Sequence, residues 1–203
     1  MSVLQTGIAK SGAADVYTID NSLRFNSGDS DYLTRTPSSV GSQRIATLSF
    51  WVKISAISAN KFIFSVQDGS DEFAIYFVDT NKLDFYSYVS GSFDMHLATS
   101  ALFRDPSAWY HIVVVIDTGN VTASERQRLF VNGVRVGSGD LSVNGEFTQH
   151  DDTILNTAAP HAIGTYSSTY MSAYLAEFYF TDGTAYDADN FGELDSTTNQ
   201  WKP

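Results

Sequence analysis

The sequence predicts an all-β protein folded as an antiparallel two-sheet sandwich. Apolar and polar residues alternate with a period of two along most of the chain, as they do in half-buried strands. The strand candidates recur at intervals of about ten residues, which is typical of sandwiches. Clusters of Gly, Asn, Asp and Ser separate them and mark the turns. Short strands joined in this way pack as two antiparallel sheets.

The individual strands follow in order from residue 45. In 45–54 every even position is apolar, whereas Thr47, Ser49 and Lys53 are polar, so this segment is expected to be half-buried. Segment 110–116 is apolar on both faces. The other predicted strands are 62–66, 73–78, 83–89, 128–131, 134–137, 161–166 and 171–181.

Two local features complete the secondary-structure prediction. Asn132 and Gly133 supply the two positive-φ residues of a type I′ turn, which predicts a hairpin over 129–136. Segment 190–194 is the only candidate for a helix longer than a turn.

Length favours one domain, since 203 residues fit a single large β-sandwich. We divide the chain into an N-terminal docking arm (1–20), a sandwich (21–185) and a C-terminal tail (186–203) that wraps the outside. Phe191 and Trp201 are expected to anchor this tail.

Composition excludes several classes of partner and chemistry. The 12 Lys and Arg against 23 Asp and Glu give a net charge of −11, which repels nucleic acids and anionic membranes. No window approaches the roughly 18 apolar residues that span a bilayer, and residues 1–20 lack the pattern of a signal peptide. The chain has no cysteine, so disulfides and thiol chemistry are excluded.

Four segments of the chain stand in an order that occurs in a known family. They are Ser22-Leu23-Arg24-Phe25 with Tyr32-Leu33, Leu48-Ser49-Phe50-Trp51-Val52-Lys53, Trp109-Tyr110-His111 with Phe130-Val131-Asn132-Gly133, and Ala162-Ile163-Gly164 before Leu175-Ala176-Glu177-Phe178-Tyr179-Phe180. In order and spacing they resemble the concanavalin A-like jelly roll, specifically its laminin G and pentraxin branch. The resemblance covers about residues 22–182 and implies a jelly-roll sandwich that binds ligands rather than transforming them.

The end of the chain carries a narrower resemblance. Thr181-Asp182-Gly183-Thr184-Ala185, Asn190-Phe191-Gly192-Glu193 and Gln200-Trp201-Lys202-Pro203 resemble the ending of laminin G-like domains in virion proteins of tailed bacteriophages. This implies a non-enzymatic structural component of the virion surface: a head decoration, a head fibre or part of a tail fibre. Its partners would be capsid or fibre proteins of the same particle and, through the lectin-like fold, cell-surface polysaccharide. Because virion attachment follows symmetry, we expect a homo-oligomer.

Calcium is the candidate cofactor. Segments 26–31 and 68–72 concentrate the hard oxygen donors that calcium prefers. Pentraxins hold calcium with an acidic pair before the strand equivalent to 73–78, so the resemblance assigns Asp71 and Glu72 as metal ligands. The carboxylate-rich turn that completes a pentraxin site is replaced by the uncharged segment 165–168. The alternative is that both acidic segments form Asx turns.

Tyrosines are the candidate sugar contacts, because sugar C–H faces stack on aromatic rings while hydroxyls bind polar groups. We assign this role to Tyr166 and Tyr170, which flank hydroxyl residues in a loop-like segment. Tyr86 and Tyr88 also lie beside a hydroxyl residue, Ser87. The alternative is that these rings fill the core or a subunit interface. The second hypothesis for function is therefore a calcium-assisted carbohydrate-binding lectin.

A glycoside hydrolase is the third hypothesis, and the sequence disfavours it. Jelly-roll glucanases of the laminarinase type carry Glu-x-Asp-x-Glu on a strand, with the two catalytic carboxylates on one face. The nearest match, 193–197, lacks the second Glu and lies in the tail. No Gly-x-Ser-x-Gly motif is present, and the four histidines lack the spacing of a zinc motif. We expect no catalytic residues, and we expect His111 to be a buried residue of the sheet.

Overall fold

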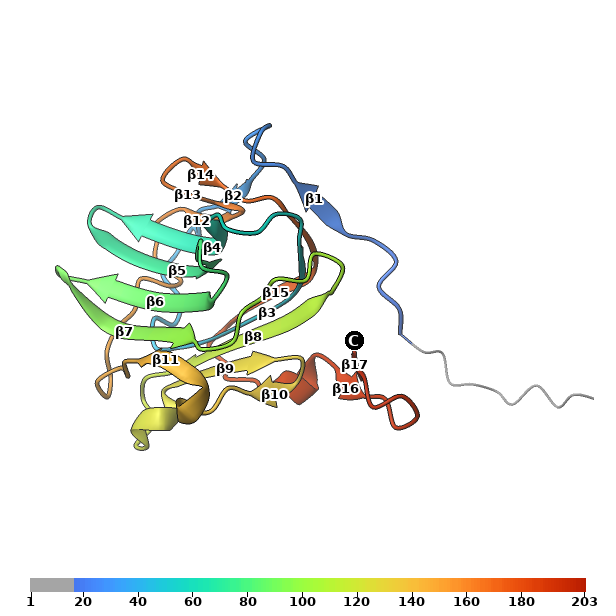
Figure 1. Cartoon of the computed structure of the whole chain (residues 1–203). Helices are drawn as coiled ribbons and strands as arrows, with labels where there is room; N and C mark the ends of the chain where they lie inside the picture. Colours follow the sequence, from blue (N-terminus) through green and yellow to red (C-terminus); the bar gives the residue numbers. More distant parts are fainter. Residues whose placement is uncertain (1–16) are drawn as a thin grey trace, which may run out of the picture.

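The computed structural model describes residues 17–203, and these form the antiparallel two-sheet jelly-roll sandwich that the sequence predicts (Figure 1). Most of the docking arm predicted over residues 1–20 lies outside the described residues. Residues 17–22 form no regular secondary structure before the first strand.

Two large sheets contain most of the strands. Sheet A has the order β1 (Leu23–Phe25), β15 (Ala173–Asp182), β3 (Ile45–Ile54), β8 (Tyr110–Asp117), β9 (Gln127–Val131) and β10 (Val134–Arg135). Sheet B has the order β11 (Leu141–Asn144), β7 (Ser92–Thr99), β6 (Leu83–Val89), β5 (Asp71–Phe77), β4 (Lys61–Asp68), β12 (His161–Ile163) and β2 (Leu33–Arg35). Two short hairpins lie outside the sheets, β13 (Thr165–Tyr166) with β14 (Thr169–Tyr170) and β16 (Glu193–Leu194) with β17 (Trp201–Lys202).

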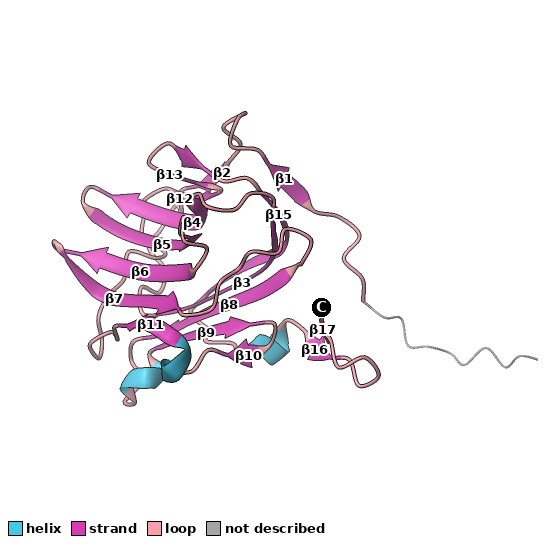
Figure 2. Cartoon of the chain, in the orientation of Figure 1, coloured by secondary structure: helices cyan, strands magenta, loops and turns pink. Residues whose placement is uncertain are grey.

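Among residues 17–203, helix is limited to three single turns of 3-10 type, drawn in cyan in Figure 2: η1 (Ala123–Glu125), η2 (Ser138–Asp140) and η3 (Ala188–Asn190). The prediction of a helix over 190–194 is wrong. Glu193 pairs with Lys202 and Leu194 with Trp201, so the backbone of this segment bonds across a hairpin instead. Over residues 17–203, none of the helices has the length and apolar character needed to cross a membrane.

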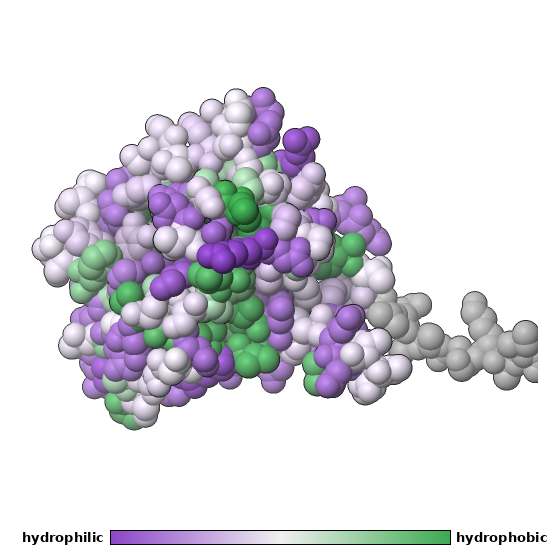
Figure 3. All heavy atoms as spheres, viewed as in Figure 1, coloured by the Kyte–Doolittle hydropathy of each residue, from purple (hydrophilic) through white to green (hydrophobic). Residues whose placement is uncertain are grey.

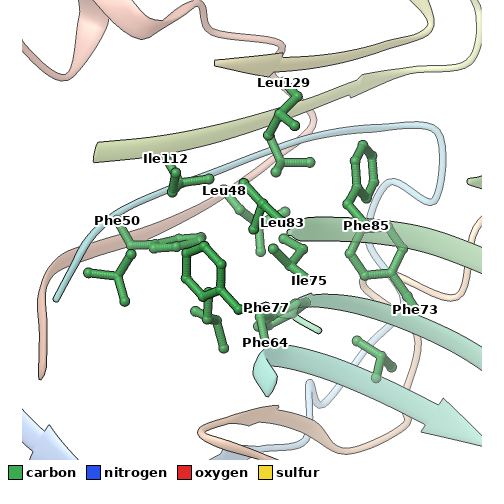
Figure 4. Close-up of a cluster of buried hydrophobic side chains, with 14 of the residues drawn as sticks. Leu48, Phe50, Phe64, Phe73, Ile75, Phe77, Leu83, Phe85, Ile112 and Leu129 are labelled. Carbon is green, nitrogen blue, oxygen red and sulfur yellow. The ribbon is translucent and has the colours of Figure 1, made fainter. Parts of the chain in front are cut away.

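The main core lies between the two sheets and is rich in phenylalanine. Phe50 from sheet A stacks on Phe178 at 5.6 Å, and Phe64 from sheet B meets Phe178 at 6.0 Å. Figure 4 shows side chains of both sheets pointing toward one another across this space, among them Leu48, Ile75, Leu83, Phe85, Ile112 and Leu129. The view in Figure 3 looks between the sheets, and hydrophobic residues gather in the middle of that face.

The outer face of sheet A is covered as well, which corrects the prediction that 45–54 is half-buried. Thr47 and Ser49 are buried although they point away from the main core. A second hydrophobic cluster lies on this face, where the C-terminal segment packs on β8 and β9. Its members are Val113, Val115, Phe130 and Ala188, with Ala185, Phe191 and Trp201 packed against them. Segment 110–116 is apolar on both faces because both faces are covered.

The buried polar groups of this face are hydrogen-bonded to the segment that covers them. The Thr47 hydroxyl donates to the Thr184 carbonyl at 2.8 Å and accepts from the Tyr186 N–H at 2.9 Å. Ser49 and His111 share a hydrogen bond of 2.9 Å. His111 is buried on a sheet face, as the sequence predicts. Burial of these polar residues is tolerated because each has a partner.

The hairpin between β9 and β10 contains the predicted positive-φ pair. Asn132 has φ 49° and Gly133 has φ 77°, the left-handed region that a type I′ turn requires. The Trp201 ring lies directly against Gly133, where a side chain would collide with it. Glycine is therefore required at this position both by the backbone and by the packing of the C-terminal segment.

Candidate functional site

The outer face of sheet B is the surface that the described elements leave open. The hairpin β13–β14 packs on its β4 side, and the strands to the other side have no covering layer in the described part of the chain (Figure 1). Because side chains alternate along a strand, the cross-strand pairs Phe62–Tyr76, Tyr76–Asp84 and Glu72–Tyr88 all project outward from the core.

A row of stacked rings forms one half of this face. Phe62 stacks on Tyr76 with ring centroids 4.6 Å apart and planes 6° apart. Tyr166, from the hairpin, stacks on the other side of Phe62 at 4.6 Å and 29°. Phe62 is buried between them, whereas Tyr76 and Tyr166 are half-buried. The two outer rings thus present polar edges to solvent above an apolar base.

A second group of rings continues the surface across β6 and β7. Phe93 is 56% exposed and makes edge contacts with Tyr86 at 5.6 Å and Tyr88 at 5.2 Å. It also stacks on His96 at 4.9 Å. A large exposed aromatic ring supported on three sides by other rings is a rigid platform for a ligand.

Carboxylates lie among these rings and are held in place. Glu72 accepts a hydrogen bond from the Tyr86 hydroxyl at 3.1 Å and also interacts with the Tyr166 hydroxyl. Asp84 is 2.8 Å from Nε2 of His96. We name the set of Phe62, Glu72, Tyr76, Asp84, Tyr86, Tyr88, Phe93, His96 and Tyr166 the aromatic face.

Three tyrosines of the aromatic face, Tyr76, Tyr86 and Tyr166, keep their protons far above neutral pH. Burial, followed by the nearby charge of Asp84, raises the pKa of Tyr76 to about 12. Burial and the hydrogen bond with Glu72 raise the pKa of Tyr166 to about 12. The pKa of Tyr86 is raised by burial and by Glu72 in the same direction. The face therefore offers hydroxyl groups beside anionic carboxylates, and it can both donate and accept hydrogen bonds.

The two tyrosines predicted as sugar contacts point in different directions. Tyr166 belongs to the aromatic face, but Tyr170 pairs with Thr165 on the other strand of the hairpin. Adjacent residues of a strand point to opposite sides, so Tyr170 faces away from Tyr166. It lies against Tyr32, with ring centroids 6.0 Å apart. Sugar contact by these two rings stays a prediction.

The two predicted calcium ligands are likewise separated. Glu72 lies on the aromatic face, whereas Asp71 accepts a hydrogen bond of 2.9 Å from the backbone N–H of Ser90 at the end of the strand. Successive strand residues project to opposite faces, so these two side chains point in different directions. Within residues 17–203, no three His, Cys, Asp or Glu side chains are grouped closely enough to hold a metal. Calcium binding by the protein stays an untested prediction.

Several residues of the aromatic face were not predicted from the sequence. Phe62 and Tyr76 were assigned only as strand residues, although their alternation with core residues already places them on an outer face. Phe93 and His96 belong to β7, which was not predicted. Segment 92–97 alternates polar and apolar residues in the sequence. A bulge in β7, where Ser87 opposes Met95 and Tyr88 opposes Phe93, turns Phe93 to the outer face, whereas strict alternation would place it in the core.

A family model described as "Concanavalin A-like lectin/glucanases superfamily" matches residues 26–189. No curated protein has a matching sequence. Among solved structures, domains LG4-5 of the mouse laminin α1 chain share 14% sequence identity at a TM-score of 0.58, and the match covers 86% of this chain and 46% of that one.

Two further solved structures share the fold. The receptor-binding domain of botulinum neurotoxin D matches at 13% identity and a TM-score of 0.57, covering 87% of this chain and 43% of that one. Domain 4 of AbnA, an extracellular arabinanase from Geobacillus stearothermophilus, matches at 17% identity and a TM-score of 0.54, covering 76% and 68%. It was solved in complex with arabinotriose. At these identities the likeness concerns the fold.

Proposed function

Because the chain belongs to the concanavalin A-like lectin/glucanases superfamily, we propose that it is a non-enzymatic carbohydrate-binding protein whose aromatic face contacts the sugar. The observation that carries the proposal is the stack of Tyr166 on Phe62 beside the carboxylate of Glu72. Sugar rings stack on aromatic side chains, and their hydroxyls bind carboxylates and phenols. The arabinotriose complex of the arabinanase domain supports this class of ligand for the fold.

The spacing of the carboxylates supports binding without hydrolysis. Glu72 lies opposite Tyr88, whereas Asp84 lies opposite Tyr76, four residues further along β5. Four residues of a strand span roughly 13 Å, which exceeds the separation of about 5–9.5 Å that glycoside hydrolases use. The motif-like Glu193 and Asp195 lie elsewhere, where both pair with Lys202 at 3.0 and 3.7 Å.

We further propose a setting for this binding: the surface of a bacteriophage particle, with capsid or fibre proteins as partners and a homo-oligomer as the working unit. The support is the resemblance of three short segments within 181–203 to the ending of laminin G-like domains in phage virion proteins. The C-terminal segment packs on sheet A, so attachment through that side would leave the aromatic face directed toward a cell surface. Repeated copies would strengthen weak sugar contacts by multivalency.

A glycan array tests the carbohydrate proposal on the full-length protein, run once with calcium and once with a chelator. We expect saturable binding of at least one neutral glycan, and loss of that binding in Tyr166→Ala. Tyr170→Ala is the matched control, because it removes the same side chain from the other side of the same hairpin. Binding in the chelator arm would show that calcium is dispensable.

Two results would overturn the proposal. One is a folded protein that binds no glycan on the array. The other is binding that survives Tyr166→Ala and is lost in Tyr170→Ala, which would move the site to the Tyr32 side of the hairpin.

A further inference from the structure

A second site is suggested by a cleft on the opposite side of the molecule. It has a volume of about 670 Å³ and lies on the outer face of sheet A, between the C-terminal segment and Tyr17. Its aromatic lining consists of Tyr17, Trp51, Tyr179 and Phe191. This volume falls in the range of small-molecule sites, which run from about 300 to 1,000 Å³.

A backbone irregularity brings Glu177 into the cleft. β15 pairs with β3 through Ala176–Trp51 and then Tyr179–Ser49, so two residues oppose the single Phe50. Phe178 takes the inward place and stacks on Phe50. The extra residue is Glu177, which has φ 48° and lines the cleft. Bulges often redirect a side chain beside a functional site. A glutamate whose backbone lies in the left-handed region is uncommon.

The carboxylate of Glu177 is hydrogen-bonded by neutral groups. The Tyr179 hydroxyl donates to it, and this bond raises the pKa of Tyr179 to about 12. The Tyr17 phenol also approaches it, which raises the pKa of Tyr17. Its hydrogen-bonding capacity is thus partly met, but within residues 17–203 no Lys, Arg or His forms an ion pair with it.

The rest of the lining adds negative charge. Asp189 accepts a hydrogen bond of 3.2 Å from the Asn190 side-chain amide. Among residues 17–203 it forms no ion pair. The cation of the lining, Lys202, is already paired with Glu193 at 3.0 Å. His111 is neutral at pH 7, because burial lowers its pKa to about 4. The lining therefore holds two carboxylates whose charge is uncompensated by the described residues.

We propose that this cleft binds an organic cation, an ammonium group carrying alkyl substituents, between its aromatic residues and Glu177. Aromatic rings attract such cations through their negative faces, and alkyl groups lower the cost of removing the cation from water. A neutral sugar would offer further hydroxyl donors to a carboxylate that already accepts hydrogen bonds from phenols. A cation would instead compensate the negative charge of Glu177. The site is separate from the aromatic face and does not depend on the function proposed for that face.

Calorimetric titration of the full-length protein with tetramethylammonium chloride tests this proposal. Ionic strength is held constant with sodium chloride, and tert-butanol serves as an uncharged ligand of similar size. We expect saturable binding of the ammonium ion with a Kd below about 100 mM. We expect no binding of the alcohol. Glu177→Gln keeps the shape and the hydrogen-bond acceptor but removes the carboxylate charge that attracts the cation, so it should weaken binding about tenfold.

Glu146→Gln is the matched control, because it makes the same change at an exposed position away from the cleft. Its affinity should equal that of the wild type. Tyr179→Leu removes a ring without changing charge and should also weaken binding, which keeps the test decisive should Glu177→Gln fold poorly. The proposal is overturned by absence of saturable binding, by equal binding of tert-butanol, or by unchanged affinity in both cleft variants.

Discussion

The indole Nε1 of Trp201 donates a hydrogen bond of 2.9 Å to Nδ1 of His111, and this bond fastens the C-terminal segment to sheet A. An indole N–H can only donate, so Nδ1 is the acceptor and the proton of the neutral imidazole is on Nε2. That proton is donated to Ser49 Oγ at 2.9 Å. The Trp201 bond requires a neutral imidazole, because an imidazolium has no free acceptor.

Replacing Trp201 by Phe removes the donor while keeping an aromatic ring. Nδ1 of His111 would then be buried without a partner, which costs about 1–3 kcal/mol. We expect the free energy of unfolding, measured by urea denaturation, to fall by that amount. Trp109→Phe is the control, since Trp109 is 37% exposed. An equal loss in the two variants would contradict the role given to the hydrogen bond.

Stability should depend on acid pH through His111. Burial lowers its pKa from 6.5 to about 4, so its contribution is complete above pH 6.5 and is lost as the pH falls through 4. The shift corresponds to about 3 kcal/mol at most. Urea denaturation at several pH values should show this decrease, and it should be smaller in His111→Gln. Part of it will remain, because burial also lowers the pKa of His161. An identical pH dependence in both proteins would argue against this assignment.

Gly133→Ala should destabilise the protein more than an ordinary glycine replacement. Gly133 has φ 77° and lies against Trp201, whereas Gly69 has φ 62° with open space around it. Gly69→Ala therefore measures the backbone cost alone, about 1–2 kcal/mol. Thermal or urea unfolding should give a larger loss for Gly133→Ala. Similar losses would mean that the ring of Trp201 moves aside at little cost.

The fold class followed from the sequence because burial on one face imposes a period of two, and most of the strands of both sheets keep it. The covering of sheet A was harder to predict. Val113 and Val115 indicate a second buried face on β8, but Thr47 and Ser49 on β3 read as exposed. They are buried because partners distant in the sequence, Thr184 and His111, complete their hydrogen bonds.

The candidate site was only partly predictable for a related reason. Tyr166 was identified from a local pattern of aromatic and hydroxyl residues, and the same pattern selected Tyr170. The direction of each ring depends on the register of a two-residue hairpin, which local composition does not determine. Phe93 could not be assigned to this face from the sequence, because strict alternation places it in the core with Met95 and Leu97, and a bulge in β7 turns it outward instead.

Tyr76 and Tyr166 of the aromatic face should titrate late in alkali. The pKa values of Tyr76 and Tyr166 are raised to about 12, so their protonated form stabilises the fold below pH 10 and this contribution is lost as the pH rises toward 12. Absorbance at the tyrosinate band should show a group of tyrosines that ionise late. Their ionisation should overlap the pH range in which the protein unfolds. Tyr166→Phe should remove one of them. Titration of all tyrosines near pH 10 in the folded protein would contradict the burial of this face.

The most direct measurement is to map the bound sugar on the protein by NMR chemical-shift perturbation, using the glycan that binds best on the array. We predict shifts concentrated on the aromatic face, at Tyr76, Tyr88, Phe93 and Tyr166, with residues of sheet A unchanged. Shifts concentrated at Glu177 and Tyr179, or at Tyr32 and Tyr170, would contradict the account by placing the sugar at another site.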